Sequence, residues 1–196
     1  MPREFPRYHS TLMRLEAQLF HNAHNLLIDA CILYKAKSFP TAFALAVLAF
    51  EELGKLHLID HVGAEACLSP KIERQKRLKW LFSRDGVFNH VIKQRWALDE
   101  TGRVFAEAYQ NGSLDRLKQD AFYVGFKRGR VTVPDRIGSR TAYDQIKRGV
   151  RVMQRTDDLP FVALFEDSNP ASRWLARRYI KSASDALAKL GKKNER

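Results

Sequence analysis

Pro40-Thr-Ala-Phe-Ala-Leu-Ala-Val-Leu-Ala-Phe-Glu-Glu-Leu-Gly-Lys55 is the most informative segment of the chain for its fold. Its first part is apolar without a break from Ala42 to Phe50. That run is too short to span a bilayer, which needs about 20 apolar residues. A helix that is apolar on all sides belongs in the middle of a bundle, and a proline such as Pro40 suits the first turn of a helix. The stretch therefore predicts a buried central helix that ends near His61, before Gly63.

Three charged residues follow the apolar run on one side of the same helix: Glu51, Glu52 and Lys55. Charges that point towards a core must be paired, and residues four apart on a helix can pair with each other. We therefore expect an ion pair between Glu51 and Lys55. Gly54 has a low helix propensity and is expected to let a neighbouring helix approach closely. The ion pair is either a structural part of the core or a support for a functional site.

Further helices are predicted on both sides of this central one. A first long helix should span residues 10–37, because leucines and alanines recur there at steps of three and four. A basic helix over 69–82, with Pro70 in its first turn, and another helix over 87–109 should follow the central helix, with Asp85-Gly86 between them. One edge of the first helix carries a polar stripe that we expect to face the arc of Glu51 and Glu52. The stripe consists of Gln18, Asn22, Asn25 and Asp29.

The character of the sequence changes between residues 111 and 138. Segments 121–126 and 131–134 are typical of short strands on either side of a basic turn, Lys127-Arg128-Gly-Arg130. Ser139 should then cap a helix whose apolar residues are Tyr143, Ile146, Val150 and Met153. Residues 157–168 should form a connector.

The last helix should begin at Asn169-Pro170 and end in a frayed basic tail from about residue 191. Its inward residues are expected to be Leu175, Tyr179, Ala183, Ala186 and Leu190. The prediction for the whole chain is one all-α domain over residues 1–196, with a short hairpin excursion around 121–134.

The charge of the chain is unevenly distributed. Residues 1–69 contain 6 Lys and Arg against 7 Asp and Glu, whereas residues 70–196 contain 28 against 15. The net charge of +12 therefore comes from the second part, which favours a polyanionic partner: RNA, DNA or an acidic protein. The N-terminus has no apolar segment of a signal peptide, and the two cysteines do not form a disulfide framework. We expect a cytoplasmic protein without membrane attachment.

Neither a metal site nor a cofactor is predicted. His57 and His61 are four apart on one helix, but Leu58 stands where a zinc peptidase has its glutamate. A di-iron bundle uses Glu-x-x-His, and no glutamate in the chain has a histidine three residues later. A glycine-rich phosphate loop at the start of a helix is also missing.

Arg84 and His90 are the remaining candidates for chemistry. Five residues separate them, and they lie within residues 71–98, which hold eight Lys and Arg against two acids. An arginine can stabilise the charge of a phosphorane-like transition state, and a histidine can transfer protons near neutral pH. The pair is sufficient for metal-free cleavage of RNA through the 2′-hydroxyl. Its spacing also occurs by chance, because Arg3 with His9 and Arg14 with His21 have similar spacings.

Several stretches resemble the AbiV-type abortive-infection family, whose helical proteins are grouped with the HEPN domains. The most specific is Ala44-x-Ala-x-x-Ala-Phe-Glu-Glu-Leu-Gly-Lys55. Supporting matches are Asn22-Ala-x-x-Leu-Leu-x-Asp29-Ala, His90-x-x-Lys93 and Lys118-Gln-Asp-Ala-Phe-Tyr-Val124 with Pro134. Gly125 stands where the family often has aspartate. The resemblance covers about residues 16–135 and implies a HEPN-like helical bundle.

The resemblance also implies a function. It is that of an antiphage effector that stops translation, acting as a homodimer in which Arg-x4–6-His motifs of two subunits form a metal-independent ribonuclease site. Arg84 and His90 would be that motif, supported by Asn22, Asp29, Glu51, Glu52, Lys55, Lys93 and Tyr123. Basic residues would bind the RNA (tRNA, mRNA or rRNA): Lys76, Arg77, Lys79, Arg95, Lys127, Arg128 and Arg130.

Two alternatives remain open at this point. The first is a non-catalytic effector that binds RNA, a translation protein or a phage protein through its basic surface, and a phage-encoded activator is a further expected partner. The second is an RNA-binding accessory bundle without a role in defence.

Overall fold

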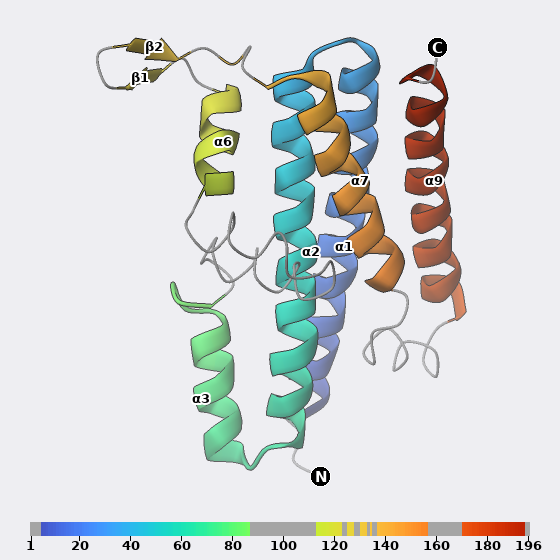
Figure 1. Cartoon of the computed structure of the whole chain (residues 1–196). Helices are drawn as coiled ribbons and strands as arrows, with labels where there is room; N and C mark the ends of the chain where they lie inside the picture. The colour runs from blue at the N-terminus through green and yellow to red at the C-terminus, as the bar shows by residue number, and fades with distance from the viewer. Residues whose placement is uncertain are drawn as a thin grey trace.

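The computed structural model describes six helices and one hairpin, and Figure 1 shows their arrangement. The described residues are 5–86, 113–122, 125–127, 130–132, 134, 137–156 and 170–194. The helices are α1 (Phe5–Lys35), α2 (Phe39–Leu68), α3 (Lys71–Leu81), α6 (Ser113–Phe122), α7 (Ser139–Arg155) and α9 (Pro170–Asn194). The strands are β1 (Gly125–Lys127) and β2 (Arg130–Thr132). The all-α prediction is confirmed.

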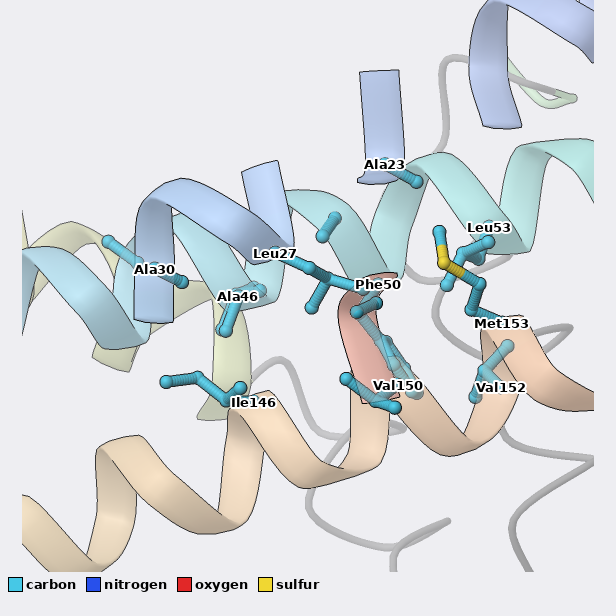
Figure 2. Packing of buried hydrophobic residues seen from close by; sticks show 14 of the residues in the cluster. Ala23, Leu27, Ala30, Ala46, Phe50, Leu53, Ile146, Val150, Val152 and Met153 are labelled. Atoms are coloured by element: carbon cyan, nitrogen blue, oxygen red, sulfur yellow. The ribbon is translucent and has the colours of Figure 1, made fainter. Parts of the chain in front are cut away.

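Helix α2 is the centre of the bundle, as its sequence predicts. It packs against α1, α7, α3 and α6, with α3 and α6 on one side of it and α9 at the opposite edge (Figure 1). Most side chains of its apolar run are buried, including Phe43, Val47 and Phe50, whereas Leu45 and Leu48 are half-buried. Figure 2 shows Leu27 of α1 and Val150 of α7 beside Phe50 in this core. Burying a leucine or phenylalanine side chain contributes about 1.5–3 kcal/mol, so this junction contributes several kcal/mol to stability.

The turn between α1 and α2 has an unusual residue in a common motif. The amide of Lys37 donates to the carbonyl of Tyr34 at 3.0 Å and that of Ser38 to the carbonyl of Leu33 at 2.9 Å, which is the pattern of a Schellman C-cap. Lys37 has a φ of 63°, where glycine is the usual residue. Ser38 and Pro40 then start α2.

Helix α2 continues past the predicted end at His61 and reaches Leu68. Gly63 is buried inside the helix, where an added Cβ would lie 3.2 Å from Cδ1 of Leu12. The glycine therefore permits close packing against α1 and does not terminate the helix. The helix ends before Pro70, because a proline disfavours the helical conformation of the residue that precedes it. Pro70 is the N-cap of α3, just outside its first turn.

The segment after residue 111 differs from the prediction. Residues 113–122 form a helix, α6, so the predicted strand over 121–126 begins only at Gly125. The hairpin itself is confirmed: β1 and β2 are antiparallel, with Phe126 opposite Val131. Helix α6 was not predicted although Leu114, Leu117 and Ala121 recur at steps of three and four, because the helix is short and overlaps the β-prone segment that begins at Ala121.

Helices α7 and α9 complete the bundle. Gly138 is the N-cap of α7, so the predicted cap Ser139 is instead its first helical residue. Ala183 and Leu190 of α9 are buried as predicted, whereas Leu175 is 39% exposed, contrary to prediction. Helix α9 also continues to Asn194, so the predicted frayed tail is helical over residues 191–194.

Candidate functional site

Arg84 lies on a tightly bonded turn directly after α3. The amide of Gly86 donates to the carbonyl of Ser83 at 3.1 Å, and that of Ser83 to the carbonyl of Trp80 at 2.9 Å. The hydroxyl of Ser83 also accepts from the amide of Asp85 at 3.2 Å. Arg84 itself is exposed. The turn therefore presents its guanidinium to solvent from a fixed backbone.

Gly86 is essential to the shape of this turn. A Cβ at this position would lie 2.2 Å from the carbonyl oxygen of Leu81 and 2.5 Å from that of Trp80. Both neighbours are backbone atoms and cannot move aside as a side chain can. Any other residue at position 86 would therefore displace the turn that carries Arg84.

Helix α3, which ends in this turn, is anchored on α2 by two arginines. Arg74 donates from Nε to the carbonyl of Ala66 at 3.2 Å and from Nη2 to that of Ser69 at 3.1 Å. Arg77 forms ion pairs with Glu65 and, at 3.4 Å, with Glu73. Arg77, a predicted RNA ligand, thus also holds α3 in place. The predicted ligands Lys76 and Lys79 are both exposed.

Other predicted site residues lie outside the residues that the structure describes, or are described for their backbone alone. His90, Lys93, Arg95, Tyr123 and Arg128 are not among the described residues. Lys127 and Arg130 are described as backbone partners in the hairpin. Their roles, and the pairing of Arg84 with His90, therefore remain predictions.

The charged cluster on α2 does not pair as predicted. Glu51 pairs with Lys118 of α6, whose Nζ lies 2.8 Å from Glu51 Oε1, and the two side chains are only 3% and 5% exposed. Lys118 also contacts Asp115 Oδ1 at 2.9 Å. Lys55 pairs with Glu52. The predicted pair of Glu51 and Lys55 is wrong because a cation on another helix is better placed than the one four residues away.

The electrostatics of Lys118 follow from these contacts. Burial alone lowers the pKa of a lysine, but the hydrogen bonds and charges of Glu51 and Asp115 outweigh it, so the pKa of Lys118 is raised. The lysine is therefore a fixed positive charge at neutral pH. The two carboxylates and one lysine carry a net charge of −1 and form a bridge between α2 and α6.

Three further polar residues are buried without having been predicted as site residues: Glu16 of α1, and His57 and Asp60 of α2. Burial and the charge of Asp60 raise the pKa of Glu16 to about 9, and burial lowers the pKa of His57 to about 4. Both side chains are therefore neutral at pH 7. Helical spacing could have identified Glu16, because it follows Leu12 by four residues on the apolar face.

The polar stripe of α1 lies elsewhere than predicted. Asn22 and Asp29 are exposed, whereas Glu51 is buried. The neighbouring His21 contacts α9, with its Nδ1 2.8 Å from the hydroxyl of Tyr179. His24 stacks on the same tyrosine ring with a centroid separation of 4.4 Å. This edge of α1 therefore serves the docking of α9.

Comparison with known proteins supplies a family for this fold. The family model HEPN_AbiV, described as AbiV, matches residues 11–154. The chain belongs to the AbiV-type HEPN family. No curated protein and no solved structure matches it. The match spans both the Glu51 motif of α2 and the Lys118 motif of α6, so the two sequence motifs of this AbiV-type chain meet in space through one ion pair.

Two further properties bear on the class of chemistry. In the described part of this AbiV-type chain, no three His, Cys, Asp or Glu side chains are grouped so that they could hold a metal ion. None of the described helices combines the length and apolar character needed to cross a membrane.

Proposed function

We propose that this AbiV-type protein is an antiphage abortive-infection effector that acts as a metal-independent ribonuclease and shuts down translation. The observation that supports the proposal most is Arg84, an exposed arginine on a fixed turn at the end of a basic helix, in a chain of a HEPN family. His90 follows the same turn in sequence. The active form would be a homodimer in which two copies of this motif share one cleft.

The proposed reaction is cleavage through the 2′-hydroxyl. The 2′-oxygen attacks the adjacent phosphorus as its hydroxyl proton passes to His90, and the bond from phosphorus to the 5′-oxygen breaks as that oxygen receives a proton from His90. The products are a 2′,3′-cyclic phosphate and a free 5′-hydroxyl. Arg84 would stabilise the negative charge that accumulates on the phosphate oxygens, which is the largest catalytic effect in many enzymes. General acid–base catalysis by His90 would contribute about 10²–10⁴-fold.

Substrate RNA would be held through its phosphates by the exposed lysines of α3, Lys76 and Lys79. Each phosphate neutralised on a single strand gives a log–log salt slope of about −0.7. Reversing both charges should therefore reduce the salt dependence and weaken binding to unrelated RNA sequences alike.

The test is cleavage of labelled RNA by purified protein and its variants, with product ends identified by mass spectrometry. His90→Ala and Arg84→Lys should both lose activity, because an ammonium cannot replace the bidentate guanidinium. Arg140→Lys is the matched control, since Arg140 is an exposed arginine on α7, and it should cut normally. Activity that EDTA abolishes, or full activity in His90→Ala, would contradict the mechanism. RNA binding without cleavage by the wild type would favour the non-catalytic effector.

A further inference from the structure

A groove runs along the surface where α9 lies against α1, away from the turn of Arg84. It encloses about 420 Å³, which falls within the range of about 300–1,000 Å³ typical of ligand sites. Its walls are α1 from Ile28 to Lys35 and α9 from Arg178 to Lys189. Figure 1 shows α9 at the edge of the bundle opposite α3. Along α9 the groove spans 11 residue steps, or about 16 Å of helix.

The floor of the groove is aliphatic. It is formed mainly by Ile28, Ile32 and Ala186, and Ile32 is 57% exposed. Covering an exposed isoleucine with an apolar group gains free energy, at about 25 cal/mol per Å² of apolar surface removed from water. The floor is therefore suited to an apolar partner surface.

The rim of the groove is cationic. Four basic side chains border it, and a single carboxylate, Asp185, lies among them. The four are Lys35, Arg178, Lys181 and Lys189. Asp185 is four residues from both Lys181 and Lys189, yet within the described part of the chain none of the four cations forms an ion pair. The rim therefore has an excess positive charge that a partner could neutralise.

We propose that this groove binds an amphipathic acidic helix of a protein partner. Such a helix would place apolar residues at i, i+3, i+4 and i+7 over Ile28 and Ile32, which is the common way in which helices bind grooves. Its flanking glutamates or aspartates would meet Lys181 and Lys189 on the rim. The proposal concerns a different surface from the ribonuclease site and stands independently of it.

A nucleic acid fits this groove less well. Proteins that bind single strands stack bases on aromatic rings, and none of the described residues that line the groove is aromatic. Trp174 is 60% exposed and has the guanidinium carbon of Arg178 5.3 Å from its ring centroid, but it does not line the groove. An aliphatic floor between rows of cations is instead complementary to an acidic helix with one apolar face.

The test uses a synthetic helical peptide of about 16 residues, or about 24 Å, with leucine at the four anchor positions, glutamate at the positions beside them and alanine elsewhere. Binding to the full chain is measured by fluorescence anisotropy. A Kd at or below about 100 µM is expected. A peptide with lysine in place of glutamate should not bind.

Substitutions in the groove should distinguish the contribution of the cationic rim from that of the aliphatic floor. Lys181→Glu with Lys189→Glu should weaken peptide binding at least about tenfold, and Ile32→Ser should weaken it although every charge is retained. Arg140→Glu with Arg151→Glu reverses two exposed charges on α7 and should have no effect. In methyl NMR spectra, Ile28 and Ile32 should shift with peptide, whereas Ile72, which is 72% exposed on α3, should not.

Several results would overturn the proposal. They are the absence of binding by the acidic peptide, equal binding by the lysine peptide, or full binding by the variant with both lysines reversed. Displacement of the peptide by a uridine oligonucleotide, with oligonucleotide binding unaffected by Ile32→Ser, would identify the groove as an RNA surface instead.

Discussion

Replacing Lys118 with methionine should destabilise the protein far more than replacing Lys55. Methionine retains most of the apolar stem of lysine but leaves the carboxylate of Glu51 without the cation that lies 2.8 Å from it. At that distance and an effective dielectric constant of about 20, the attraction is about 6 kcal/mol before desolvation is counted. Removing one partner from a buried pair typically costs about 3–5 kcal/mol. We expect a loss of that size for Lys118→Met.

Lys55→Met is the matched control, because Lys55 and Glu52 are 25% and 16% exposed. More exposed pairs contribute about 0–1 kcal/mol. Free energies of unfolding should be measured by urea denaturation at one protein concentration, with circular dichroism as the signal. Adding Glu51→Gln to Lys118→Met removes the carboxylate that Lys118 neutralises in the wild type and should restore at least about 2 kcal/mol. Equal effects of Lys118→Met and Lys55→Met, or no recovery in the double variant, would refute this account of the ion pair.

Two other predictions concern the turn after α3 and the buried groups of α1 and α2. Gly86→Ala should lower the free energy of unfolding by about 1–3 kcal/mol, because the new Cβ would meet backbone oxygens. Gly138→Ala is the control, because a Cβ there meets nothing within 4 Å. Equal urea midpoints for the two variants would contradict the prediction. His57 has a pKa lowered to about 4, so the folded state binds fewer protons than the unfolded state, and stability should fall by roughly 3 kcal/mol as the pH drops from about 6.5 to 4. Glu16 has a pKa raised to about 9, so the folded state binds more protons than the unfolded state. The free energy of unfolding should therefore fall as the pH rises from about 4.5 to 9. His57→Leu should remove the fall in stability at low pH, and Glu16→Gln should remove the fall at high pH. An unchanged pH profile in either variant would contradict the prediction for that residue.

The features that sequence predicted well are those fixed by local patterns. The apolar run from Ala42 to Phe50 leaves no polar face, so a buried central helix was the only arrangement that satisfied it. Pro40 placed the start of that helix correctly. The hairpin was found because short β-prone segments flank a glycine-containing turn.

The features that sequence missed depend on contacts between distant residues. Lys118 lies 67 residues from Glu51, so the local rule of four-residue spacing selected Lys55 instead. Gly63 has a low helix propensity, which predicts a helix end, but it lies inside α2 because it packs closely against Leu12 of α1. In each case a tertiary contact outweighs the local preference, which is about 1 kcal/mol for a glycine in a helix and about 0.2–0.5 kcal/mol for an ion pair four residues apart.

The burial of Glu51 changes how its motif should be understood. A carboxylate that is 3% exposed and bonded to Lys118 contributes by fixing α6 against α2, and it presents no surface to a substrate. Helix α3, anchored on α2 by Arg74 and Arg77, lies on the same side of α2 as α6 (Figure 1). The turn of Arg84 and the helix of Lys118 are therefore both held by α2. It follows that substitutions at Glu51 should act on function through the position of these elements, and activity should fall in proportion to the loss of structure.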